Sequence, residues 1–268
     1  MPDLTAPPIL ETRAASIGYG NKLILRNLDF TVPKASFTAL LGPNGCGKST
    51  LLKALAGLIR PQNGTVLIDG RSVSKLPRKE LAQHIGLLSQ NQSAPEGMTV
   101  IDLVKQGRYP HRTLFGRWTK EDDDACAEAL ALTDTTHLSG EKFDTLSGGQ
   151  RQRAWIAMTL AQRTSVLLLD EPTTFLDLSH QLDTLRLTRK LVRERGVTAV
   201  AVLHDINQAA RYADNLVLLK DGTIVAEGSP SDVLTPETVK RVFDVDITII
   251  RNPRTQAPIV VPVGDHGL

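Results

Sequence analysis

The chain has 268 residues, of which 41% are hydrophobic, and its 31 basic and 29 acidic side chains give a net charge of +2. That length and apolar content predict one large domain, or one domain with an insert. A charge this even argues against a protein that binds nucleic acid. The two cysteines, Cys46 and Cys126, lie far apart in the sequence, which argues against a zinc site and a disulfide framework.

No apolar stretch approaches the roughly 18–20 residues that span a bilayer. The first residues have neither the basic start nor the apolar core of a secretory signal. We therefore expect a protein that is made in the cytosol and stays there. It would reach a membrane only by holding a partner that spans it.

The first 90 residues are expected to form strands, with one helix among them. A turn that contains Tyr19 joins the first two strands, and a helix is expected over 48–58, directly after a glycine-rich loop. The last strand of this part ends at Gln90. Apolar patterning predicts the strands over 9–17, 23–32, 36–41, 65–68 and 85–89.

The middle of the chain has helical spacing only. Helices are predicted over 99–108 and 120–132, and a third begins after Ser147. No strand is expected between them, so this stretch reads as a helical insert in an α/β protein. The linker between the first two helices is rich in aromatic and basic residues.

Strands and helices alternate again toward the C-terminus. Short, wholly apolar strands of this kind are typical of a parallel sheet that is covered on both faces. The tail from Asp244 is expected to form two more strands around Asn252 and Pro253. The predicted elements are strands over 165–169, 197–203, 215–219 and 223–226 and helices over 178–195 and 206–212.

The loop between the strand at 36–41 and the following helix has the Walker A pattern G-x-x-x-x-G-K-S. Its glycines let successive backbone N–H groups turn toward phosphate oxygens, and the helix N-terminus adds further donors. Lys48 is expected to reach the β- and γ-phosphates, and the Ser49 hydroxyl to ligate Mg²⁺. The predicted ATP-binding loop comprises Gly42, Pro43, Asn44, Gly45, Cys46, Gly47, Lys48, Ser49 and Thr50.

Two carboxylates, Asp170 and Glu171, end the apolar strand at 165–169. A P-loop enzyme needs an acid near its metal, at the C-terminal edge of the sheet. Asp170 fits that position and would act through a metal-bound water. Glu171 is expected to polarise the attacking water as a general base.

The run Leu146-Ser147-Gly148-Gly149-Gln150 has the form of a capped helix start. Ser147 stands where an N-cap belongs, and the two glycines open the helix. The sequence therefore predicts a second anion-binding helix end, separate from the phosphate loop.

Together these motifs resemble the ATP-binding subunits of ABC transporters, over about residues 10–243. The run from Leu146 to Gln150 is identical to the family signature. The resemblance implies an α/β fold with a P-loop (RecA-like) core, an antiparallel β subdomain and a helical insert that carries the signature. It also implies one ABC ATPase domain over 1–268, with its core in 9–90 and 160–243, its helical subdomain in 91–159 and an extension over 244–268.

The resemblance further assigns roles to residues that composition and spacing leave open. Tyr19 would stack on adenine, Gln90 would sense Mg²⁺ and couple to the membrane partner, and His204 would contact the γ-phosphate. Two copies of the chain would enclose two ATP molecules head to tail. The partner's nucleotide would then be contacted in trans by Ser147, Gly148, Gly149, Gln150 and Asp177.

A finer likeness is to the ATPases of bacterial iron–siderophore importers. This rests on Gly107-Arg108-Tyr109-Pro110-His111, on Leu114, Phe115 and Trp118, and on the stretch 173–181. It implies uptake of an iron(III)–siderophore complex through two permease subunits with a separate substrate-binding protein, driven from the cytoplasmic side of the cell membrane. The stretch 108–118 is interpreted as an ordered loop or as part of the surface that docks a permease loop.

Three alternatives stay open at this point. Haem and vitamin B12 importers share parts of the same pattern. A non-transport ABC ATPase of DNA repair or translation usually has two cassettes, a coiled coil or zinc inserts, none of which this sequence shows. An exporter or lipid ABC ATPase is the third alternative, against which the absence of a fused membrane domain argues.

Overall fold

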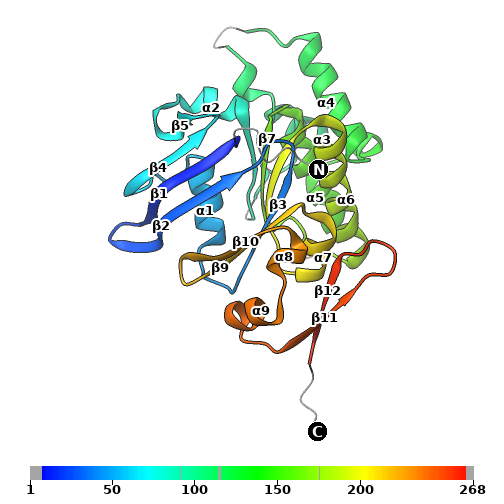
Figure 1. The fold of residues 1–268 in the computed structure, drawn as a ribbon. Coiled ribbons are helices and arrows are strands. Elements are labelled where there is room, and N and C mark those ends of the chain that lie inside the picture. Colours follow the sequence, from blue (N-terminus) through cyan, green and yellow to red (C-terminus); the bar gives the residue numbers. More distant parts are fainter. Residues whose placement is uncertain (1–7, 91, 114–115, 175, 264–268) are drawn as a thin grey trace. The chain divides into compact units, whose positions relative to one another are not determined.

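The computed structural model describes residues 8–90, 92–113, 116–174 and 176–263. The chain divides into two compact units (Figure 1). The first comprises Met1–Lys75 and Thr198–Leu268, and the second comprises Leu76–Val197. Each unit is described by itself.

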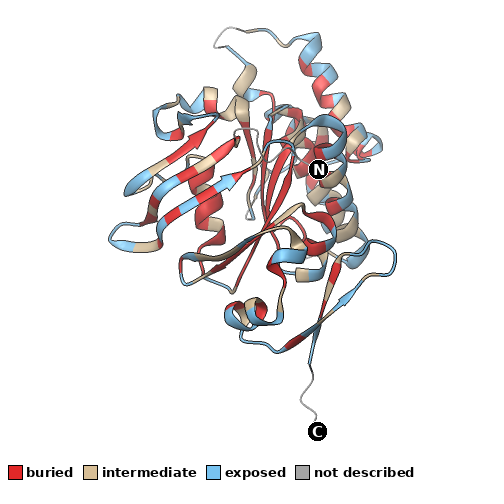
Figure 2. Ribbon diagram, in the orientation of Figure 1, coloured by how far each residue is buried: buried red, intermediate tan, exposed pale blue. Residues whose placement is uncertain are grey.

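An antiparallel sheet in the order β2-β1-β4-β5 forms one part of the first unit. The side chains of β2 alternate between exposed and buried toward its end, as expected of a strand with one face on a core (Figure 2). The strands are β1 (Leu10–Tyr19), β2 (Lys22–Val32), β4 (Asn63–Ile68) and β5 (Arg71–Ser72).

The other sheet strands of this unit follow the order β10-β9-β3-β8. Strand β3 pairs in parallel with both β8 and β9, and every residue of β3 and β8 is buried. Uniform burial explains why these segments are apolar throughout and do not alternate. The strands are β3 (Phe37–Leu41), β8 (Thr198–Val202), β9 (Asn215–Lys220) and β10 (Thr223–Gly228).

Helix α1 (Lys48–Leu55) packs on strands of both sheets, β1, β4 and β8. It ends three residues earlier than the spacing predicts, because Gly57 adopts a φ of 70° that ends the helix. Residues 8–75 and 198–263 of this unit also form a 3₁₀ turn and three further helices. They are η1 (Val73–Lys75), α7 (Ile206–Tyr212), α8 (Pro230–Val233) and α9 (Pro236–Phe243).

The tail forms the antiparallel hairpin of β11 (Ile247–Arg251) and β12 (Pro258–Pro262), which confirms the two predicted strands. Asn252 begins the turn: its Oδ1 accepts hydrogen bonds from the backbone N–H groups of Arg254 and Thr255 at 2.9 and 3.1 Å. Strand β12 packs on α7. The side chain of Asn207 there exchanges two hydrogen bonds with the backbone of Val260, at 2.7 and 3.1 Å.

The second unit is mainly helical around one parallel pair of strands. Strands β6 (Ile85–Leu88) and β7 (Val166–Asp170) run in register from Ile85 opposite Val166. Among the described residues no strand lies between β6 and β7, as predicted for the insert. Helix α2, which precedes β6, was not expected. The helices and 3₁₀ turns are α2 (Arg78–His84), α3 (Val100–Gln106), η2 (Tyr109–His111), α4 (Lys120–Leu132), η3 (Thr136–Leu138), η4 (Phe143–Thr145), α5 (Gly148–Ala161) and α6 (Leu178–Arg195).

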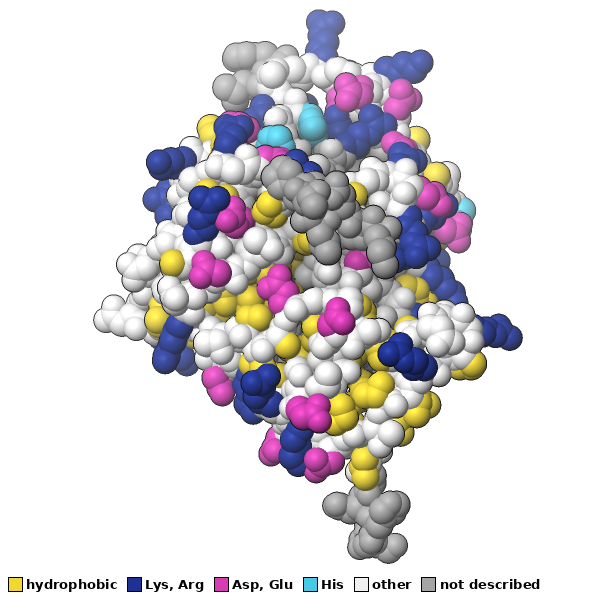
Figure 3. Space-filling model, in the orientation of Figure 1, with side chains coloured by type: hydrophobic (Ala, Val, Ile, Leu, Met, Phe, Trp, Pro, Cys, Tyr) yellow, Lys and Arg dark blue, Asp and Glu magenta, His cyan; other side chains and the backbone are white. Residues whose placement is uncertain are grey.

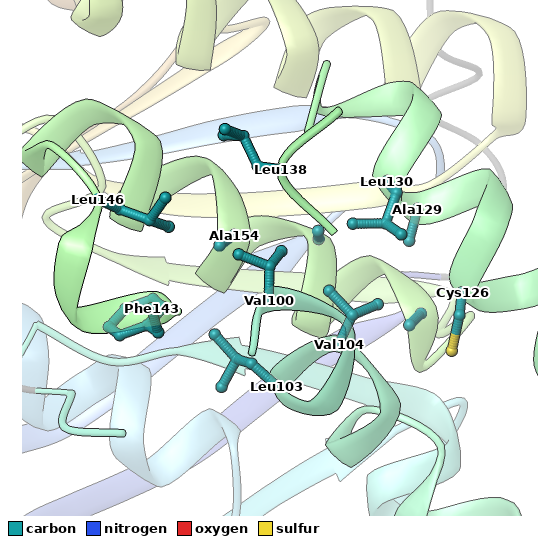
Figure 4. Packing of buried hydrophobic residues seen from close by; sticks show 12 residues of the cluster. Val100, Leu103, Val104, Cys126, Ala129, Leu130, Leu138, Phe143, Leu146 and Ala154 are labelled. Carbon is teal, nitrogen blue, oxygen red and sulfur yellow. The ribbon is translucent and has the colours of Figure 1, made fainter. Parts of the chain in front are cut away.

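A hydrophobic core joins α3, α4 and α5 and supports the start of α5 (Figure 4). Small residues of α5, such as Ala154 and Ala157, share this core with the larger Val100 and Val104 of α3. Leu146 is 6% exposed, so the residue just before Ser147 is anchored in this core. Burial of a leucine contributes about 1.5–3 kcal/mol.

Among the residues that the structure describes, none of the helices combines the length and hydropathy needed to cross a bilayer. On the face shown in Figure 3, basic and acidic side chains are interspersed. This agrees with the nearly equal numbers of the two kinds in the sequence.

Candidate functional site

The glycine-rich loop lies between β3 and α1, as predicted. Gly42 adopts a φ of 149°, and a Cβ there would lie 2.1 Å from the carbonyl oxygen of Leu219. Gly47, the N-cap of α1, has a φ of 109°, and a Cβ there would lie 2.5 Å from Cδ2 of Leu25. Both positions therefore require glycine for conformation and for space.

Lys48 is buried at the start of α1, with only 5% of its surface exposed. Its Nζ donates hydrogen bonds to the carbonyl oxygens of Gly42 and Pro43, at 2.7 and 2.9 Å. The ammonium group is thus held inside the loop by the loop's own backbone. A buried cation next to a helix N-terminus that no side chain caps is a strong site for an anion.

Cys46 lies in the same loop and is 6% exposed. Burial raises the pKa of its thiol, although the nearby Lys48 ammonium acts in the opposite direction. The thiol is therefore a packed, protonated side chain of the loop at neutral pH.

His204 follows β8 at the edge of the sheet where the glycine-rich loop follows β3. Strands β3 and β8 are parallel neighbours in which Leu40 pairs with Val202, and the N–H of Leu203 donates to the carbonyl oxygen of Leu40 at 3.1 Å. Since parallel strands end at the same edge, Gly42 and His204 follow adjacent strand ends. Tyr19 ends β1 and is 51% exposed, so its ring is accessible.

Asp170 and Glu171 stand at the end of β7 in the second unit. Asp170 is 4% exposed, and Glu171 adopts a left-handed φ of 54°, a conformation that costs a non-glycine residue about 1–3 kcal/mol. Gln90 Nε2 donates to Oε2 of Glu171 at 2.7 Å, although the two residues are 81 positions apart. Thr174 Oγ1 donates to the same oxygen at 3.1 Å, a contact that the sequence did not predict.

The predicted cap at the signature run is confirmed. Ser147 Oγ accepts from the N–H of Gln150 at 3.3 Å, and Gln150 Oε1 accepts from the N–H of Ser147 at 2.9 Å. Leu146 and the core beneath it fix the start of the helix, while Ser147 and Gly148 are exposed. This helix end therefore presents backbone donors on the surface of its unit.

Asp177 caps the neighbouring helix α6. Its Oδ1 accepts from the N–H and from Nδ1 of His180, at 2.9 and 2.7 Å, and from Oγ of Ser179 at 3.0 Å. These hydrogen bonds, the backbone one first, lower the pKa of Asp177 to about 2. The sequence did not single out His180. Its position three residues after an N-cap was the available signal.

Arg108 is buried, with 2% of its surface exposed, and this corrects its expected place on a docking surface. Its Nε donates to Asp122 Oδ1 at 2.8 Å and its Nη1 to the carbonyl oxygen of Ala161 at 3.0 Å. Tyr109, next in the chain, is 74% exposed. Leu114, Phe115 and Phe175, on which the finer resemblance partly rests, lie outside the described residues.

Burial tends to raise the pKa of Asp122. The hydrogen bonds from Arg108 and Thr119 outweigh this and lower the pKa to about 2. The ion pair therefore ties the end of α3, the start of α4 and the last turn of α5 together inside the second unit.

A family model described as ABC transporter matches residues 25–174, which is more than half of the chain. The chain belongs to the ABC transporter family. Its fold is that of the ABC ATPases, which hydrolyse ATP to drive transport. The expected α/β fold class is therefore confirmed, and the phosphate loop, β7 and the signature run all lie within the matched residues.

Among curated proteins, the ferric enterobactin transport ATP-binding protein FepC of Escherichia coli is 51% identical over 93% of this chain and 92% of its own length. A transporter described as of the metal-chelate type, solved in an inward-facing conformation, matches with a TM-score of 0.83 and 30% identity over 96% of this chain and 98% of the other. An ATP-binding cassette solved as a dimer in a post-hydrolysis state with ADP and Pi matches with a TM-score of 0.72 and 30% identity. The match covers 82% of this chain and 98% of the cassette.

Proposed function

We propose that this ABC ATPase powers the uptake of an iron(III)–siderophore complex through a separate membrane permease. The 51% identity to a ferric enterobactin transport protein over almost the whole of both chains carries this proposal. The likeness to a metal-chelate type transporter supports the same substrate class. The siderophore itself never needs to touch this chain.

One half of the proposed site is the phosphate loop. The loop from Gly42 to Thr50 binds the triphosphate through backbone N–H groups, which every residue of the loop except Pro43 has, and Lys48 reaches the β- and γ-phosphates. In the structure the Lys48 amine donates to two loop carbonyls. A phosphate would compete for those donors and form charge-assisted hydrogen bonds, which are about twice as strong as neutral ones. Tyr19 stacks on the adenine.

Glu171 is the proposed general base, which accepts a proton from the attacking water. Gln90 already donates to its Oε2, so the glutamine orients this carboxylate. His204 is proposed to contact the γ-phosphate from the adjacent strand end.

The Ser49 hydroxyl, the Asp170 carboxylate and the Gln90 amide supply oxygen donors of the kind that Mg²⁺ prefers, and we propose them as its ligands, Asp170 through water. The buried carboxylate at the end of β7 fits a divalent cation. Bound Mg²⁺ would neutralise phosphate charge.

The other half of the proposed site belongs to a second copy of the chain. The signature residues Ser147, Gly148, Gly149 and Gln150, together with Asp177, contact ATP that is held by the partner's phosphate loop. The capped start of α5 supports this arrangement, since Ser147 and Gly148 are exposed there. The dimeric cassette structure supports a paired state for this fold.

In this proposal ATP closes the pair and hydrolysis opens it, and the movement drives two permease subunits served by a substrate-binding protein. The chain would lie peripherally on the cytoplasmic side of the cell membrane. We propose its core in 9–90 and 160–243, its helical subdomain in 91–159 and its extension in 244–268. The exposed Tyr109 supports a docking role for exposed residues of the stretch 108–118, among which the buried Arg108 is not counted.

Glu171→Gln tests both the proposed general base and the proposed ATP-dependent dimer. The amide cannot accept the proton, so turnover should fall by about 10²–10⁴-fold while ATP binding stays. Light scattering after gel filtration should then show an ATP-dependent dimer. Only monomer with ATP would contradict the paired site, and Glu194→Gln on the exposed end of α6 serves as a control that hydrolyses ATP normally.

Uptake of ⁵⁵Fe-labelled siderophore by the host tests the substrate class. A deletion strain should lose this uptake, and the wild-type chain should restore it where Glu171→Gln does not. Haem and vitamin B12 uptake measured in the same strain separates the alternative importers. Normal uptake of all three substrates in the deletion strain would contradict the proposal and favour a non-transport ABC ATPase or an exporter or lipid ABC ATPase.

A further inference from the structure

The two signature glycines have different surroundings within the chain. A Cβ built on Gly148 would meet nothing within 4 Å. A Cβ built on Gly149 would lie 2.7 Å from Cδ2 and 2.8 Å from Nε2 of His180. The imidazole of α6 therefore occupies the space of a side chain at 149, and any larger residue there would have to displace the ring.

The opposite edge of the same ring holds Asp177. Nδ1 of His180 lies 2.7 Å from Asp177 Oδ1, and an ionised carboxylate only accepts hydrogen bonds, so Nδ1 carries the proton. Three donors converge on Oδ1. Within the described part of the chain, Oδ2 of Asp177 makes no hydrogen bond, and the side chain is 65% exposed.

Packing alone does not hold the ring over Gly149. A cavity of about 170 Å³ lies beside it, lined among others by Gly149, His180, Arg153 and Asp183. The imidazole has room to swing away, so the hydrogen bond to Asp177 is what keeps it in place.

We propose that His180 is a positioning residue that ties Asp177 to the start of α5, so that both meet the partner's nucleotide as one rigid unit. This inference rests on the proposed trans roles of Asp177 and of the signature run. His180 itself touches neither nucleotide nor reacting atoms. One edge of its imidazole ring fixes the rotamer of Asp177, and the opposite edge lies against Gly149 at the start of α5.

The test compares His180→Ala, His180→Asn and the control His137→Ala, an exposed histidine of the same unit. Each is measured for ATP binding by the monomer, for kcat and KM, and for ATP-driven dimerisation with Glu171→Gln added. His180→Ala should lower kcat and weaken dimerisation by about 10-fold or more, since a misplacement of 1 Å can reduce rates 10²-fold. Monomer binding of ATP should stay within twofold.

His180→Asn should restore most of the loss, because its amide nitrogen can donate to Asp177 as Nδ1 does. Equal losses in the Ala and Asn variants would overturn the proposal, and so would dimerisation and kcat of His180→Ala within twofold of wild type. If Glu171→Gln with His180 intact forms no dimer with ATP, the proposed function fails instead.

The ring's place is tested independently by NMR of the full chain with ¹⁵N-labelled histidine. Gly149→Ala should displace the ring and shift the His180 resonances, whereas Gly148→Ala should leave them unchanged. Identical spectra for the Gly149→Ala variant and the wild type would overturn the contact on which the inference depends.

Discussion

The two helix N-termini for which we propose contacts with nucleotide, those of α1 and α5, differ in burial. At α1 the cap is Gly47, no side chain occupies the N–H donors, and the buried Lys48 stands directly behind them. At α5 the cap is Ser147, whose hydroxyl already satisfies one donor, and no lysine follows. Gly148 there faces open space.

This difference in burial accounts for the different roles that we propose for the two helix ends. A helix end with free donors and a buried cation can hold a triphosphate by itself, because the charge acts in a low dielectric. A capped and exposed helix end gives weaker hydrogen bonds in water, and it gains strength only when a partner's surface excludes the water. In the proposed function the start of α1 therefore binds nucleotide by itself, and the start of α5 contacts nucleotide that the partner has bound.

Removing the cation should show the largest effect at the first helix end. Lys48→Ala should lower ATP turnover by about 10³-fold or more, comparable to the loss of a preorganised donor to a developing charge. Titration with a fluorescent ATP analogue should show that binding itself is lost. Lys53→Ala, on the last turn of the same helix, should bind as wild type does. Undiminished turnover in the Lys48 variant would contradict the binding role.

The helical core of the second unit contains a buried ion pair between Arg108 and Asp122, which Arg108→Met removes. Asp122 would keep its buried charge without a partner, and breaking such a pair destabilises by about 3–5 kcal/mol. Urea unfolding of the full chain measures this loss. Arg186→Met, which breaks an exposed pair with Asp183, should cost less than about 1 kcal/mol.

Acid gives a second measure of the same ion pair. The folded pKa of Asp122 is about 2 against an ordinary 3.8, so its stabilisation is present above pH 4 and is lost as pH falls from about 4 through 2. The Arg108→Met chain should lose less stability over that window than the wild type. An equal loss in both chains would mean that the pair does not hold the carboxylate charged.

A large side chain at the start of α5 should reduce ATP turnover without changing ATP binding at the phosphate loop. Ser147→Arg places a large cation where the partner's ATP would lie, so turnover should fall by about 10²-fold, as for the loss of one oriented contact. ATP binding by the monomer should not change. Ser147→Ala, which removes only the cap and about 1 kcal/mol of helix stability, should retain much more activity. A fully active Ser147→Arg variant would refute the proposed role in trans.

The smallest effect concerns α7, the helix that follows His204 in the first unit. Asn207→Ala removes both hydrogen bonds to Val260 and should cost about 1–2 kcal/mol. Hydrogen exchange at the Val260 amide should become faster, while Thr248→Ala on the exposed face of β11 should leave it unchanged. Unaltered exchange in the Asn207 variant would show that the two hydrogen bonds between Asn207 and Val260 do not hold the hairpin on α7.

Elements with strong local patterns were predictable. The strand before the phosphate loop, the serine cap of α5 and the hairpin around Asn252 each follow from residues within a few positions of one another. Helix α2 was missed because its seven residues, mostly charged or polar, bury only Leu81 and so show no apolar period.

The sequence by itself determined where the glycine-rich loop and the serine-capped start of α5 lie, because glycines, caps and the lysine act on their immediate neighbours. Only the tertiary structure decided that Arg108 is buried, that Leu25 stands behind Gly47 and that His180 fills the space at Gly149. Those contacts join residues far apart in the chain or on different helices. Such contacts produce no periodic pattern in the sequence. Which of these side chains is buried depends on the packing of the folded chain.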